Sequence, residues 1–147
     1  MAYKDASSSY KETRIKTAGQ GQLIVMLYDE AVKQLTKAID LLEANKGDKK
    51  DPANIELISK AVMKTEEIIT ELMVSLDFEQ GGEISKNLFS LYTWFNRELL
   101  EANISQNTAR MVVVRDLLSE LRNTWNSISQ NTVEQPNREV AGLNIAG

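Results

Sequence analysis

The stretch that decides the fold occupies residues 111–128 and reads MVVVRDLLSELRNTWNSI. Its apolar side chains recur in alternating steps of three and four residues, at Met111, Val114, Leu118, Leu121, Trp125 and Ile128. Such steps place side chains on one face of an α-helix, and their regular alternation is the seam of a helix in a bundle. The stretch therefore predicts a long helix with one buried face.

Three segments upstream show the same period. The first carries Ile24, Leu27, Ala31, Leu35, Ala38 and Leu42. The second carries Ile58, Ala61, Ile68, Leu72 and Leu76. The third carries Ile84, Leu88, Leu91, Phe95, Leu99 and Ala102. Four amphipathic helices joined by short loops predict an all-α protein, an antiparallel four-helix bundle.

Capping residues predict where these helices begin and end. We expect the first helix to open after residues 17–20 and to end at residues 45–47. Asp51 followed by Pro52 predicts the N-cap and first residue of the second helix, because proline needs no amide partner there. The second helix is expected to stop near Asp77.

The glycine pair at residues 81–82 is interpreted as a turn between the second and third helices. The third helix is then expected to run from about residue 83 to Asn103. These limits divide the chain into an extended N-terminal segment at residues 1–16, a bundle domain at 17–130 and a flexible tail at 131–147.

The composition excludes several classes of function. The chain has no cysteine and no histidine, which excludes disulfides, thiol catalysis, the Ser-His-Asp triad and histidine-bound metals. Its net charge of -4 argues against a nucleic-acid partner. The longest apolar run, Leu23–Tyr28, is far shorter than the roughly 20 residues of a membrane span, and no signal-peptide pattern opens the chain. We expect a cytosolic protein without membrane insertion or cofactor.

The helices carry more apolar side chains than one seam each can use. The additional ones are Leu23, Val25, Met26, Val32, Ile39, Leu41, Val62, Ile69, Met73, Val74, Phe89, Leu100, Val112, Val113 and Leu117. Either the core is wide, or surfaces between helices stay partly apolar and bind another chain. The N-terminal segment, through Tyr10 and Ile15, either completes the core or covers the first helix as a displaceable lid.

Other features have ordinary structural explanations. The acidic residues around Glu66, Glu67 and Glu71 are interpreted as solvated surface, because a di-iron bundle needs a Glu-x-x-His pattern. Trp125 fits the fourth seam and is expected in the core. Trp94 lies off its stripe, so core and contact roles both stay open.

Sequence blocks along most of the chain resemble the FliS family of flagellar export chaperones. The blocks are SY at 9–10, TA at 17–18, LIVMLYD at 23–29, ELMVSLD at 71–77, GGEISKNL at 81–88, LY at 91–92, LLEAN at 99–103 and LRNTW at 121–125. One departure is GQGQL at 19–23, where the family usually has Ser-Pro-Gly-Glu-Leu. Without that proline the first helix has a less rigid start.

The resemblance implies a cytosolic four-helix-bundle chaperone that is not an enzyme. It implies binding to the C-terminal region of newly made flagellin, which prevents premature polymerisation, and delivery to the flagellar type III export apparatus. The export gate protein FlhA would receive the complex, and FliW is a further partner in some bacteria. The alternative function is a regulatory bundle whose main partner is an anti-sigma factor or a translational regulator.

Candidate partner-binding residues combine a place in the matching helices with an apolar or amide side chain. They are Tyr10, Ile15, Leu23, Met26, Leu27, Tyr28, Leu88, Tyr92, Asn103, Val113 and Leu117. Tyrosine and methionine suit such a surface, because one is rigid with a polar tip and the other adapts to irregular shapes. Asn103 has a competing interpretation as a helix cap.

Overall fold

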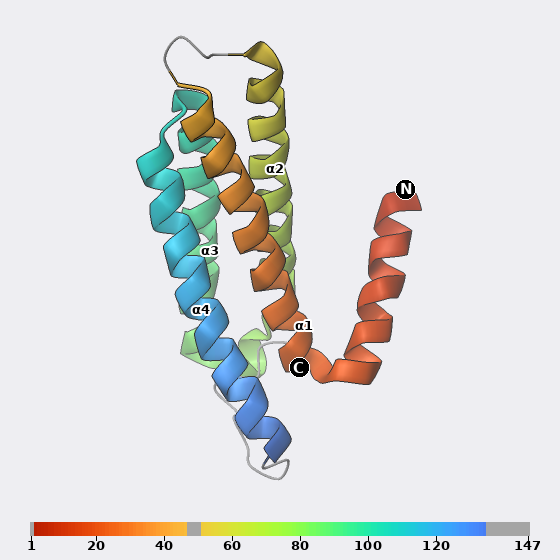
Figure 1. Ribbon diagram of the computed structural model, residues 1–147. Coiled ribbons are helices and arrows are strands. Elements are labelled where there is room, and N and C mark those ends of the chain that lie inside the picture. Colours follow the sequence, from red (N-terminus) through yellow and green to blue (C-terminus); the bar gives the residue numbers. More distant parts are fainter. Residues whose placement is uncertain (1, 47–50, 135–147) are drawn as a thin grey trace.

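The computed structural model describes the backbone of residues 2–46 and 51–134, and the side chains of residues 21–46 and 51–130. Over these residues the chain forms four helices: α1 (Ala2–Ala44), α2 (Pro52–Val74), α3 (Phe78–Ser105) and α4 (Thr108–Glu134). Figure 1 shows α2, α3, α4 and the larger part of α1 side by side, with successive helices antiparallel. The predicted all-α four-helix bundle is confirmed.

The helices are arranged as the corners of a square. Helix α1 packs against α2 and α4, and α3 packs less extensively against the same two helices. Helices α1 and α3 therefore sit at opposite corners. Because α3 has the thinner packing, more of its circumference is left for solvent or for a partner.

The interior is filled by apolar side chains from all four helices. The largest fully buried ones are Tyr28, Leu35, Ile58, Val62, Ile69, Leu72, Tyr92, Phe95, Leu99, Met111 and Leu118. Every member of the stripe predicted for the second helix is buried, and so is Trp125, as predicted. Val25, Ile39, Val62 and Ile69 are also buried, so the core is wider than one seam per helix.

Local hydrogen bonds explain the helix boundaries. Asp51 is the N-cap of α2 with Pro52 following, and its carboxylate accepts from the Ala53 amide at 3.0 Å, as predicted. Asp77 caps α3 by accepting from the amides of Glu79 and Gln80, each at 3.0 Å. The glycine pair is thus not the turn between helices, because α3 already begins at Phe78.

A kink at Gly82 separates the first turn of α3 from the rest of the helix. Gly82 has φ 50° and ψ -124°, a conformation that side chains with a Cβ rarely adopt. The helix continues beyond Asn103 to Ser105, and the left-handed Gln106 forms its C-cap. The predicted start near residue 83 matches the part of α3 beyond the kink, whereas the predicted end at Asn103 was too early.

The N-terminal segment differs from the expectation of an extended chain at residues 1–16. The helix α1 starts at Ala2, and no proline or glycine interrupts the sequence before Gly19. Figure 1 shows α1 bent, with its N-terminal part (red) apart from the other helices. At the other end α4 continues through residues 131–134, and the remainder of the predicted tail lies outside the described residues.

Replacement of Gly82 by alanine tests the kink. We expect Gly82→Ala to lower the free energy of unfolding by about 1–3 kcal/mol, because the new Cβ disfavours the positive φ. No atom lies within 4 Å of the added Cβ, so a steric clash is not the cause. The measurement is urea unfolding followed by circular dichroism. Ser90→Ala, at an exposed position of the same helix, is the control, and equal stability of the two variants would contradict the assignment.

Candidate protein-binding surface

The described side chains include large apolar groups that face solvent. They are Ile55 (47% exposed), Leu57 (43%), Met63 (57%), Val74 (80%), Phe78 (47%), Phe89 (43%), Leu100 (51%), Ile104 (71%) and Val113 (49%). Among the described residues only Val113 lies on α4, and all others belong to α2 or α3. The apolar surplus is therefore concentrated on two neighbouring helices.

Two hydrogen bonds fix how α2 and α3 lie against each other. The Ser59 hydroxyl donates to Asn103 Oδ1 at 3.2 Å, and Asn96 Nδ2 donates to Thr70 Oγ1 at 3.3 Å. Both bonds join side chains at the seam between the antiparallel helices. They define which residues of the two helices stand at the same level.

Exposed apolar residues follow this seam on both helices. On α2 the row is Ile55, Ser59, Met63, Glu66, Thr70 and Val74, spaced by three or four residues. On α3 the row is Phe89, Thr93, Asn96, Leu100 and Ile104. The antiparallel register places Met63 level with Leu100 and Val74 level with Phe89. We call these two rows the α2–α3 surface.

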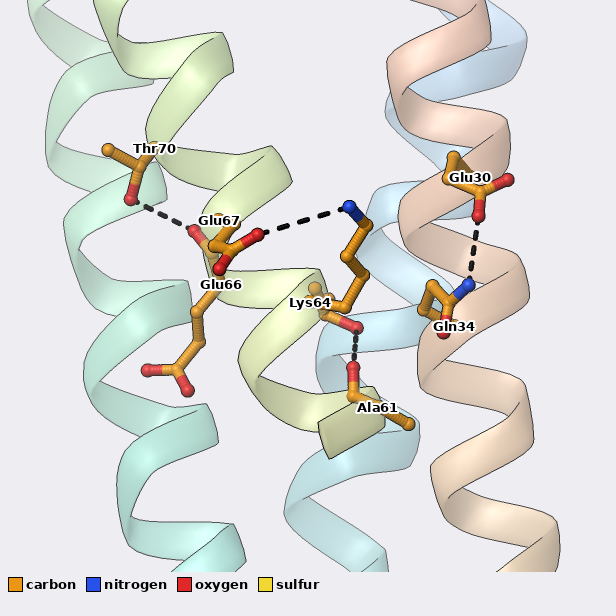
Figure 2. Close-up of polar contacts among 8 residues, drawn as sticks. Glu30, Gln34, Ala61, Lys64, Glu66, Glu67 and Thr70 are labelled. Carbon is orange, nitrogen blue, oxygen red and sulfur yellow. Dashed lines mark hydrogen bonds and ion pairs between the residues drawn. The ribbon is translucent and has the colours of Figure 1, made fainter. Parts of the chain in front are cut away.

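The centre of the α2–α3 surface is polar. Figure 2 shows the Glu67 side chain directed toward Lys64, with an ion pair of 3.9 Å, whereas Glu66 points to the other side of α2. Glu66 is half-buried and forms no ion pair among the described residues. Burial raises the pKa of its carboxyl group above the ordinary value.

A hydrogen-bonded pair of tyrosines crosses the interior between opposite corners. The hydroxyl groups of Tyr28 on α1 and Tyr92 on α3 hydrogen-bond to each other, and Trp125 hydrogen-bonds to Tyr28. Burial raises the pKa of Tyr92 to about 12 and raises that of Tyr28 further. Both phenols are therefore neutral at physiological pH, and each gives the other a hydrogen-bond partner in the core.

This pair corrects the expectation that Tyr28 and Tyr92 face a partner. The exposed fraction is 0% for Tyr28 and 1% for Tyr92, because their rings fill the space between the helices. Asn103 does not cap α3 either. It lies inside the helix and accepts from Ser59, so its side chain joins α3 to α2.

The remaining predicted candidates are spread over several faces. Val113 is exposed, and five are half-buried: Leu23, Met26, Leu27, Leu88 and Leu117. The α1 members lie at the corner opposite α3, so they do not share the α2–α3 surface. Tyr10 and Ile15 lie outside the side chains that the structure describes.

The structure adds residues that the sequence interpretation missed as a site. Val74, Phe89 and Leu100 were recognised as surplus, but Ile55, Met63 and Ile104 were not. The signal for Ile55 and Met63 was present in their spacing of four residues on either side of Ser59, and that for Ile104 in its spacing of four residues from Leu100. It becomes meaningful only once the bond from Ser59 to Asn103 shows which face of α2 meets α3.

The described residues contain no group of three or more acidic side chains that could hold a metal ion. In the same part of the chain no helix is long and apolar enough to cross a membrane. What the surface offers is apolar contact area with a few amide, hydroxyl and carboxylate groups. This arrangement is typical of helical bundles that bind other proteins.

Comparison with known proteins identifies the family. The family model described as Flagellar protein FliS matches residues 2–132, so the chain belongs to the FliS family. The flagellar secretion chaperone FliS of Salmonella typhimurium is 37% identical over 127 residues, which cover 86% of this chain and 89% of that protein. FliS of Bacillus subtilis is 25% identical over 142 residues, which cover 97% and 98%. FliSB of Pseudomonas aeruginosa, also a flagellar secretion chaperone, is 33% identical over 118 residues, covering 80% and 87%.

A double-mutant cycle tests the tyrosine pair. We expect Tyr28→Phe and Tyr92→Phe each to lower the free energy of unfolding by about 1 kcal/mol, because each removes the hydrogen bond between the two buried hydroxyls. The double variant should lose less than the sum, with a coupling of about 0.5–3 kcal/mol. Urea unfolding measures all four proteins. Strictly additive losses would show that the two hydroxyls do not depend on each other.

Proposed function

We propose that this protein is a cytosolic chaperone for newly made flagellin. It binds the C-terminal region of flagellin, covers its apolar faces and prevents premature polymerisation. It then assists delivery to the flagellar type III export apparatus, with FlhA as the receiving gate protein and FliW as a further partner. Membership of a family whose relatives are flagellar secretion chaperones supports this proposal.

The observation that carries the proposal is the α2–α3 surface. An amphipathic client segment presents apolar side chains at positions i, i+3, i+4 and i+7, which match the spacing of the two exposed rows. Covering apolar surface contributes about 25 cal/mol per Å². Residues such as Leu100 (51% exposed) and Ile104 (71%) lose their contact with water when a client helix lies over them.

A single short contact is not enough for a client that must first become ordered. Ordering a flexible segment costs free energy, so useful affinity requires a long contact that wraps around the bundle. The half-buried candidates Leu23, Met26, Leu27, Leu88 and Leu117, together with the exposed Val113, are proposed as its continuation. Tyr10, Ile15 and Asn103 also remain proposed contacts, because they lie in the part of the chain that resembles the FliS family.

Titration with flagellin tests the function. We expect the purified chain to form a one-to-one complex with full-length flagellin and none with flagellin that lacks its C-terminal region. Leu100→Glu should weaken the complex by about tenfold or more, because a charge then replaces an apolar contact at the centre of the surface. Isothermal titration calorimetry measures the affinities, and size-exclusion chromatography measures the stoichiometry.

The matched control is Ala53→Glu, which adds the same charge at an exposed position in the first turn of α2. It should leave flagellin affinity unchanged, and circular dichroism should show both variants folded. Equal binding of truncated and full-length flagellin would contradict the proposal. Tighter binding to an anti-sigma factor or a translational regulator than to flagellin would assign the chain to the regulatory alternative.

A further inference from the structure

Glu66 is a carboxylate at the polar centre of the α2–α3 surface, whose two ends are apolar. Met63 lies one turn before it on α2, and Leu100 of α3 stands at the same level as Met63. Glu66 is half-buried, and removal of water from a carboxylate disfavours its charged form. An apolar residue at this position would suit the free protein better.

No group of the described bundle compensates this charge. The neighbouring carboxylates of α2 have lysine partners, since Glu56 pairs with Lys60 at 3.7 Å and Glu67 with Lys64 at 3.9 Å. Glu66 forms no such pair, and Figure 2 shows its side chain directed away from Lys64. Arg97 and Glu101 of α3 are exposed and form no ion pair with Glu66.

The polar neighbours of Glu66 are hydrogen-bonded to groups other than its carboxylate. The Thr70 hydroxyl donates to the Glu66 backbone carbonyl at 2.9 Å, so it accepts from Asn96 Nδ2. This orientation leaves Asn96 with its Oδ1 acceptor, which is buried and has no hydrogen-bond partner. Among the described residues, no hydrogen bond or ion pair to the Glu66 carboxylate is formed, and the buried Asn96 Oδ1 beside it is likewise unsatisfied.

Resting on the proposed function, we infer that Glu66 is a specificity-determining residue that selects a client helix with a lysine or arginine within its apolar stripe. The apolar rows at both ends of the surface bind the flanking side chains of the client. The cation of the client pairs with Glu66 as water is excluded from the centre. A client without a cation at this level leaves the carboxylate buried and unpaired, which rejects it.

Two substitutions of Glu66 separate recognition from folding. Glu66→Gln keeps the shape and removes the charge, and Glu66→Leu makes the surface apolar throughout. The matched control is Glu67→Gln, because Glu67 is exposed and directed to the other side of α2. The probe is the purified C-terminal region of flagellin, titrated by calorimetry at several ionic strengths.

Both Glu66 variants should bind the flagellin probe about tenfold or more weakly than the wild type, and their affinity should depend less on salt. The control should bind as the wild type does. Glu66→Leu should also raise the urea midpoint of the free protein, so stability and affinity change in opposite directions. A purely structural role for Glu66 would change them in the same direction.

If the wild type binds flagellin and both Glu66 variants bind it equally well or more tightly, this inference is overturned. The proposed function is then left intact. A wild-type protein that binds no flagellin overturns both. Sedimentation of the free chain tests whether a second copy of the chain, instead of flagellin, occupies the α2–α3 surface. A dimer that Leu100→Glu dissociates would assign the α2–α3 surface to a second copy and overturn the inference.

Discussion

Burial of apolar side chains along the bundle axis is the interaction on which the rest of this structure depends. Helix α1 is packed most extensively, because it lies between α2 and α4 and contributes fully buried residues such as Leu35. Helix α3 packs less extensively and keeps Phe89, Leu100 and Ile104 in contact with solvent. The large apolar side chains that face solvent lie mostly on α2 and α3, with Val113 on α4 among the described residues.

The periodic spacing of apolar residues predicted the helices and most of the core, because both depend on local geometry. The stripe from Ile58 to Leu76 is buried as its spacing indicated. Spacing alone does not show which faces of two helices meet. For this reason the sequence placed Tyr28 and Asn103 wrongly. Tyr28 is buried and its hydroxyl hydrogen-bonds to Tyr92, 64 residues away. The Asn103 side chain hydrogen-bonds to Ser59, 44 residues away. The glycine pair was predicted as the turn between two helices; Gly82 does interrupt the helix, but α3 begins earlier, at Phe78, because Asp77 caps it.

The surface that suits a client is a disadvantage for the free protein. Exposed apolar residues such as Val74 and Ile104 promote self-association, while the net charge of -4 opposes it through mutual repulsion. Burial of the Glu66 carboxylate likewise disfavours its charged form, and the proposed pairing with a client cation accounts for its place. Residues that break the rules of a stable bundle thus lie together on α2 and α3, where we propose that the client binds.

Amide hydrogen exchange of the chain with and without flagellin tests the central claim most directly, because slower exchange marks the backbone that a client covers. The account predicts that flagellin slows exchange in α2 between residues 55 and 74 and in α3 between residues 89 and 104. Protection confined to the connection around Asp51, or to the sides of α1 and α4 that face away from α3, would contradict it.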